Sequence, residues 1–168
     1  MARTIYGAEL FKSPALETNF VQNLIGKNSE VFAFGDLVEY VASHGLEVIA
    51  SATPSVLGVS AKTQTMTSSN ETVAKVKPAY IPIDQDMEFL MGTNSDLDAL
   101  TSPGVYYKLT GATGAIQVDV TSGAQTTTNR VVVCTGVDPL NEGGTGSGSG
   151  LRQGLFKFVK VLNVKSNT

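Results

Sequence analysis

The sequence predicts an all-β protein, a small antiparallel barrel or sandwich built from hairpins, with an extended or partly helical N-terminal arm. Glycine-bearing turns at 43–45, 110–114 and 143–150 separate segments rich in Val, Ile, Leu, Tyr and Thr, the pattern of successive hairpins. Of the 168 residues, 42% are hydrophobic, enough to form a core, and only 16% are charged. Because typical soluble domains carry about 25% charged residues, this weakly hydrated surface favours contact with partners or other copies.

The N-terminal arm is expected to span residues 1–34. Ser13 and Pro14 are suited to begin a short helix, and Gly26 is suited to cap it. Poor helix formers lie between them. An extended arm, ordered by a partner, is therefore the alternative.

The β-domain is expected to span residues 35–168, with two small lobes, 35–91 and 92–168, as an alternative organisation. Its first hairpin joins 35–41 to 46–50, and a third strand follows at 55–61. Gly58 inside that third strand indicates a bulge or a close backbone approach.

Further elements follow along the chain. Because Pro78 and Pro82 cannot donate to a sheet, the piece between them belongs on an edge or outside the sheet. The cleanest hairpin joins 105–109 to 115–120, where apolar and polar residues alternate. The other expected elements are strands at 72–77, 87–91, 130–137 (covered on both faces) and 154–162, one helical turn at 96–100, and a mobile loop at 143–150.

The hydrophobic core is expected to draw on strand positions from both halves of the chain: Leu37, Tyr40, Val48, Val56, Val59, Val118, Val132 and Phe156.

Charge and cysteine content exclude several functions. The formal net charge is −3 and the 12 Lys and Arg residues are scattered, so a nucleic acid partner is not expected. Cys134 is the only cysteine, so it forms no intramolecular disulfide and is expected to be a buried thiol. His44, the only histidine, lies in a predicted turn, which disfavours a Cys–His pair. No signal peptide or membrane span is recognised, so we expect no membrane partner.

Candidate sites for chemistry are weak. Alternating carboxylates could bind calcium or act in glycoside hydrolysis, but a solvated acidic loop explains them more simply; they are Asp84, Asp86, Glu88, Asp96 and Asp98. Four tyrosines could form a sugar-stacking platform, but core or interface packing is the simpler interpretation; they are Tyr40, Tyr80, Tyr106 and Tyr107. The glycine tract at 143–150 lacks a phosphate-binding pattern. We therefore expect no catalytic, cofactor or metal site.

Three segments carry a family resemblance: Phe34-Gly35-Asp36-Leu37-Val38, Ala52-Thr53-Pro54-Ser55-Val56-Leu57-Gly58-Val59 and Glu71-Thr72-Val73-Ala74-Lys75-Val76. Together, over residues 34–77, they resemble the small β-barrel capsid decoration (cement) proteins of tailed bacteriophages. The resemblance implies a non-enzymatic virion protein, made in the bacterial host cytoplasm. It would bind the major capsid protein on the outer capsid surface as a homotrimer and stabilise the lattice.

A docking arm is the further implication of this resemblance, and we expect it at Ala2, Arg3, Thr4, Ile5, Tyr6, Gly7, Ala8, Glu9, Leu10, Phe11 and Lys12. Such an arm would add backbone hydrogen bonds to an edge of the capsid protein. Two other classes remain open: a carbohydrate- or receptor-binding β-module of a head fibre or tail tip, and a hydrolase that uses the acidic residues at 84–98.

Overall fold

The structure is a computed structural model that describes residues 7–12, 20–43, 45–66, 77–137 and 152–161. Within these ranges every regular element is a β-strand, and every pairing between strands is antiparallel. The all-β prediction is therefore confirmed. In the described part of the chain, no helix has the length and apolar character needed to cross a membrane.

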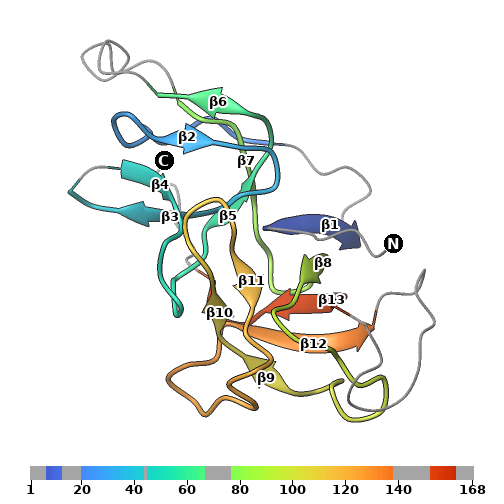
Figure 1. The fold of residues 1–168 in the computed structure, drawn as a ribbon. Coiled ribbons are helices and arrows are strands. Elements are labelled where there is room, and N and C mark those ends of the chain that lie inside the picture. Colours follow the sequence, from blue (N-terminus) through green and yellow to red (C-terminus); the bar gives the residue numbers. More distant parts are fainter. Residues whose placement is uncertain (1–6, 13–19, 44, 67–76, 138–151, 162–168) are drawn as a thin grey trace.

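The larger sheet has five strands and joins the two ends of the chain to its middle (Figure 1). Its strands, in spatial order, are β1 (Ala8–Lys12), β8 (Glu88–Gly92), β13 (Gln153–Phe158), β12 (Val132–Val137) and β9 (Tyr106–Tyr107). The first and the last of these strands form its edges.

The second sheet has four strands, in the order β4 (Gly45–Val48), β3 (Leu37–Val41), β5 (Gly58–Ser60) and β7 (Tyr80–Pro82). Two small two-stranded sheets complete the fold: β2 (Val31–Phe32) with β6 (Gln64–Thr65), and β10 (Leu109–Thr110) with β11 (Gln117–Val118). The strand orders are open, and no closed barrel is found among the described residues.

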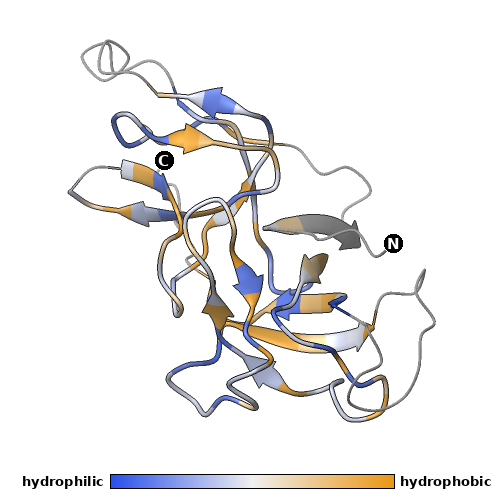
Figure 2. Ribbon diagram, in the orientation of Figure 1, coloured by the Kyte–Doolittle hydropathy of each residue, from blue (hydrophilic) through white to orange (hydrophobic). Residues whose placement is uncertain are grey.

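Two hydrophobic cores lie on opposite faces of the four-stranded sheet. Neighbouring residues of a strand point to opposite faces, so Leu37 enters the larger core and Val38 the smaller one. The larger core also contains Phe89 and Phe158, whose rings meet edge to face at 5.3 Å. The larger core therefore contains residues from both 35–91 and 92–168. Figure 2 shows hydrophobic residues along β2 and the first half of β12.

Several sequence predictions are confirmed. The first hairpin forms between β3 and β4. The cleanest one forms in part, because β10 pairs with β11 whereas Tyr106 and Tyr107 of its expected first strand pair with β12. The segment between the two prolines becomes β7, an edge strand. Gly58 marks a close approach, because a Cβ atom there would lie 2.5 Å from the carbonyl oxygen of Ile81.

Other predictions are wrong. No helix forms at 96–100. The chain instead makes a turn after Asp98, whose carboxylate accepts the Leu100 and Thr101 N–H groups and whose carbonyl accepts the Ser102 N–H. Strand β12 is buried on one face only, since Val133 is half-buried and Thr135 exposed. Tyr40 is 39% exposed, while the other seven expected core residues are buried.

The N-terminal segment that the structure describes at 20–26 is extended, not helical, and it pairs with the sheet at Val21 and Gly26. Several predictions concern residues outside the described ranges. These are the helix start at Ser13, the turn residue His44, most of the strand at 72–77, and the glycine loop.

Candidate interaction edge

The outer edge of β4 is covered by the N-terminal segment. Leu46 donates its N–H to the carbonyl of Ile25 at 2.8 Å and accepts the N–H of Lys27 at 2.7 Å. Along β4, the next backbone N–H that points away from β3 is that of Val48, and it donates to the Glu30 carboxylate at 3.4 Å. Lys27 Nζ in turn lies 3.5 Å from Glu30 and 2.7 Å from Glu47. These contacts occupy the backbone groups that an incoming strand would use.

The opposite edge of the same sheet, β7, is covered by the same segment. Val21 and Tyr80 exchange both backbone hydrogen bonds, at 2.8 and 3.1 Å. The Tyr80 hydroxyl also donates to Asn23 Oδ1 at 2.8 Å. Residues 21–27 therefore reach from one edge of the four-stranded sheet to the other, and Val21 and Leu24 pack against the smaller core on the way.

The two edges of the five-stranded sheet differ. At β9, the Tyr106 carbonyl accepts the backbone N–H of Gln125 at 2.8 Å. At β1, the Ala8 N–H donates to the Gly35 carbonyl at 2.9 Å, and no described strand pairs beyond that point. The two larger sheets have four edges. Three are covered by described residues, whereas the outer edge of β1 is covered by described residues only at its first residue, Ala8.

The predicted docking arm maps onto this edge. Its residues 2–6 lie outside the described ranges, whereas residues 8–12 form β1 and pair with β8 from Ala8 opposite Met91 to Lys12 opposite Glu88. Gly7 precedes the strand, and its N–H donates to the Ile116 carbonyl at 3.0 Å. The described part of the arm is thus a strand of the larger sheet, with a second edge facing outward.

A braced turn at 33–36 lies against the start of β1. Asp36 donates its N–H to the Ala33 carbonyl at 3.1 Å, and its carboxylate accepts the Ala33 N–H at 2.8 Å. Burial raises the pKa of Asp36; the Ala33 hydrogen bond opposes this, and the charge of Glu30 adds to it. This turn was not predicted from the sequence, although Gly35 at its third position is the signal of a type II turn.

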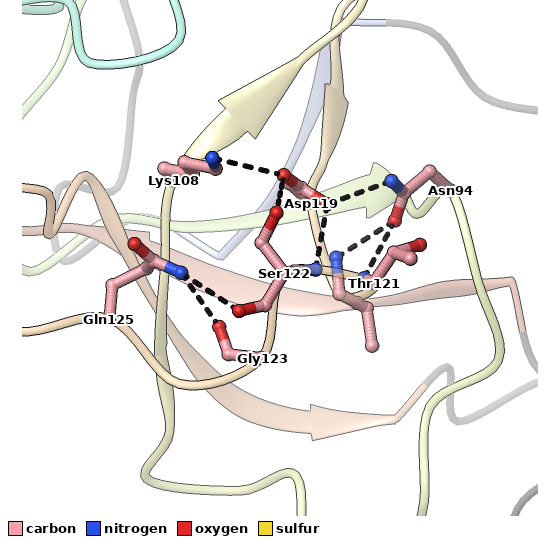
Figure 3. A network of polar contacts seen from close by, with 8 residues as sticks. Asn94, Lys108, Asp119, Thr121, Ser122, Gly123 and Gln125 are labelled. Carbon is pink, nitrogen blue, oxygen red and sulfur yellow. Dashed lines mark hydrogen bonds and ion pairs between the residues drawn. The ribbon is translucent and has the colours of Figure 1, made fainter.

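A second polar network braces the turn after β11 (Figure 3). Asp119 lies between Asn94 Nδ2, which donates at 2.8 Å, and Lys108 Nζ, at 3.5 Å. Its carboxylate also accepts the Ser122 hydroxyl at 2.5 Å and the Ser122 N–H at 3.1 Å. Burial acts to raise the pKa of Asp119, but the bonds from Ser122 and Asn94 and the charge of Lys108 outweigh it and hold that pKa below its usual value.

This network holds loops together and presents no free carboxylate to a ligand. Asn94 Oδ1 accepts the Val120 N–H at 2.8 Å and the Thr121 N–H at 3.2 Å, so its side chain is also engaged. This network is not predictable from local sequence, because Asn94 and Lys108 are distant from the Asp119 turn in the chain. The only local signal is Asp119 followed by Ser122 and Gly123.

The carboxylates considered as a metal or catalytic site do not converge. Asp84 accepts the Asp86 N–H at 3.1 Å in a local turn. Asp96 pairs with Arg152 Nε at 3.1 Å, and Glu88 accepts the Thr135 hydroxyl. Across the described ranges, no three His, Cys, Asp or Glu side chains are grouped as ligands of one ion.

The four tyrosines also lie apart. Tyr80 is buried in the smaller core and Tyr107 in the larger one. Tyr106 lies under Arg130, whose guanidinium carbon is 4.1 Å from the ring centroid, and Tyr40 is exposed at the end of β3. None of these contacts places two of the four tyrosine rings on one surface where a sugar could stack.

Cys134 is buried, as the sequence predicts, with 1% of its surface exposed. Burial raises the pKa of its thiol to about 11, although a backbone hydrogen bond from Gly136 opposes the shift. A thiol in this state is a core side chain, since the thiolate is the reactive form.

Comparisons with known proteins add no relative: no family model matches the chain, and neither the curated proteins nor the solved structures give a match. The geometry of the described residues is therefore the basis for the function proposed below.

Proposed function

We propose that the chain is a structural virion protein that binds the outer surface of a phage capsid and cements the lattice of the major capsid protein. The observation that carries the proposal is the outward edge of β1, in a fold whose other large-sheet edges are covered. An uncovered edge adds a strand from another chain through main-chain hydrogen bonds. The resemblance of residues 34–77 to capsid decoration proteins supplies the class of partner.

The proposed activity is adhesion and requires no chemical step. Three of the carboxylates considered for catalysis, those of Asp84, Asp96 and Asp98, are engaged in local turns and an ion pair, which supports this proposal. As a proposal from the resemblance, the protein acts as a homotrimer, so that each particle presents several docking edges. Many weak contacts to one surface then add up to tight attachment.

The test is quantitative co-sedimentation with shells of the major capsid protein from the same genome, assembled without this chain. The Ala8 N–H points away from β8 to Gly35, and alternate residues of an antiparallel edge point the same way. The Leu10 N–H therefore points outward. Replacement Leu10→Pro removes that donor, and Leu10→Ala is the matched control for loss of the side chain.

We expect Leu10→Pro to bind the shells at least about tenfold more weakly than Leu10→Ala, because a proline on the docking edge blocks pairing. Circular dichroism and urea unfolding of both variants check that β1 still pairs with β8. Failure of the wild-type chain to bind the shells would overturn the proposed function.

A further inference from the structure

The turn at 33–36 holds an aromatic side chain out from the protein. Phe34 is 67% exposed, the highest value among the aromatic side chains whose exposure the structure describes. Gly35 follows with φ of 89°, as the third position of a type II turn requires. A large apolar side chain at such a position is not shielded by its own fold.

The main chain of this turn is fixed at every step. The Phe34 N–H donates to Thr63 Oγ1 at 3.3 Å, and the Gly35 N–H donates to the Ser60 carbonyl at 3.0 Å. The Gly35 carbonyl accepts the Ala8 N–H, and the Asp36 carboxylate accepts the Ala33 N–H. With the backbone fixed, the ring retains little freedom beyond two side-chain torsions. Because the backbone is ordered before binding, only these two torsions lose freedom on contact, which keeps the entropy cost low.

The turn also abuts the docking edge. The hydrogen bond from Ala8 to Gly35 joins the first residue of β1 to the residue after Phe34. A strand added along the outer edge of β1 therefore ends beside this turn. We propose that Phe34 is the anchor of the docking edge. The partner adds an extended strand to β1, and an apolar pocket beside that strand receives the Phe34 ring.

This inference rests on the proposed function and names the chemistry of the partner. The size of the contact indicates which kind of partner binds this edge. A five-residue edge and one ring make a small contact, whereas stable, specific interfaces bury roughly 1,200 Å² of total surface or more. Two free copies are therefore not expected to form a stable dimer through this face. A surface that repeats the same strand and pocket many times compensates for a weak single contact, and a capsid shell is such a surface.

The test compares Phe34→Ala with Leu100→Ala in binding to the shells described above. Leu100 is the matched control because it is 76% exposed and also lies on a turn braced by a carboxylate, that of Asp98. We expect Phe34→Ala to weaken binding at least about tenfold, as loss of a central aromatic anchor does. Phe34→Leu is expected to lie between Phe34→Ala and wild type, and Leu100→Ala to match wild type.

Thr63→Val tests the bracing separately, because it removes the acceptor of the Phe34 N–H and keeps the ring. We expect weaker binding without a change in the unfolding midpoint of more than a few degrees. Wild-type-like binding by Phe34→Ala overturns the inference and leaves the proposed function standing. Absence of binding by the wild-type chain overturns both. A stable wild-type dimer in sedimentation velocity, lost in Phe34→Ala, overturns the choice of a capsid partner.

Discussion

Gly7 packs directly against the carbonyl group of Gly35, so a Cβ atom on residue 7 would overlap the Gly35 oxygen and lie 2.8 Å from its carbonyl carbon. Gly7 also has φ of 74°, a conformation that side-chain-bearing residues rarely adopt. This contact joins the start of β1 to the turn that carries Phe34. Both parts of the docking edge are therefore set by the approach of two glycines.

Gly7→Ala is expected to reduce the free energy of unfolding by about 3 kcal/mol, because the new methyl group meets backbone atoms that cannot move aside. The measurement is urea unfolding followed by circular dichroism. Gly104→Ala is the matched control: its φ is 85°, but nothing lies within 4 Å of the new Cβ. It should lose only about 1 kcal/mol from backbone strain. Equal losses in both variants would show that the close contact has no energetic effect.

Asp119→Asn is expected to destabilise the protein by about 2 kcal/mol at pH 7, since Ser122 and Lys108 lose their charged partner. The pKa of Asp119 is lowered in the folded protein. Its contribution is therefore present above the unfolded pKa of about 3.9 and is lost as pH falls through the folded pKa. The stabilities of wild type and Asp119→Asn should converge below about pH 3.

The control for Asp119 is Asp96→Asn, which removes an ion pair to the exposed Arg152. A surface pair of this kind contributes at most about 1 kcal/mol. A pH-independent gap between wild type and Asp119→Asn would contradict the assigned role of the carboxylate.

Glu39→Gln is expected to stabilise the protein by about 0.5 kcal/mol at pH 7, because Glu39 lies directly opposite Glu47 across β3 and β4. Burial raises the pKa of Glu39, the charge of Glu47 raises it further, and Lys160 opposes both. Because the folded pKa of Glu39 is raised, its contribution to stability is fully present below the unfolded pKa of about 4.3. That contribution is lost as pH rises through the folded pKa. The gain from Glu39→Gln should therefore disappear near pH 4.

Glu47→Gln is the matched control for the cross-strand pair. It relieves the same repulsion but weakens the 2.7 Å contact with Lys27 that covers the β4 edge. We expect no gain in thermal unfolding temperature from this variant. Stabilisation by Glu47→Gln equal to that by Glu39→Gln would mean that the Lys27 contact has no effect on stability.

Cys134 is expected to resist thiol reagents while the protein is folded. Its thiol is buried and its pKa is raised to about 11, so little thiolate is present at pH 8. Labelling with a disulfide reagent should follow the rate of unfolding and become fast in guanidinium chloride. Since the folded pKa is raised, stability should also fall as pH rises from about 9 toward 11. Rapid labelling of the native protein would contradict the burial of this thiol.

Local sequence patterns determine much of the strand content. Strand-forming residues on both sides of a glycine-bearing turn predict the β3–β4 hairpin. The same logic predicts the β10–β11 hairpin and the edge position of β7 between two prolines. Gly58 was recognised because a glycine inside a strand indicates a close backbone neighbour.

Tertiary structure alone decides the candidate site. Whether an edge is covered depends on segments far apart in the chain, such as Val21 on β7 or Gln125 on β9. The exposure of Phe34 and of Tyr40 depends on which other elements pack against them in the fold. The pattern of apolar residues along a single strand does not predict this. Pairing between distant strands depends on side-chain packing and burial in the whole fold more than on intrinsic preference. The sequence by itself therefore determined that this chain forms antiparallel strands, and only the tertiary structure decided that β1 presents the edge that the described residues leave uncovered.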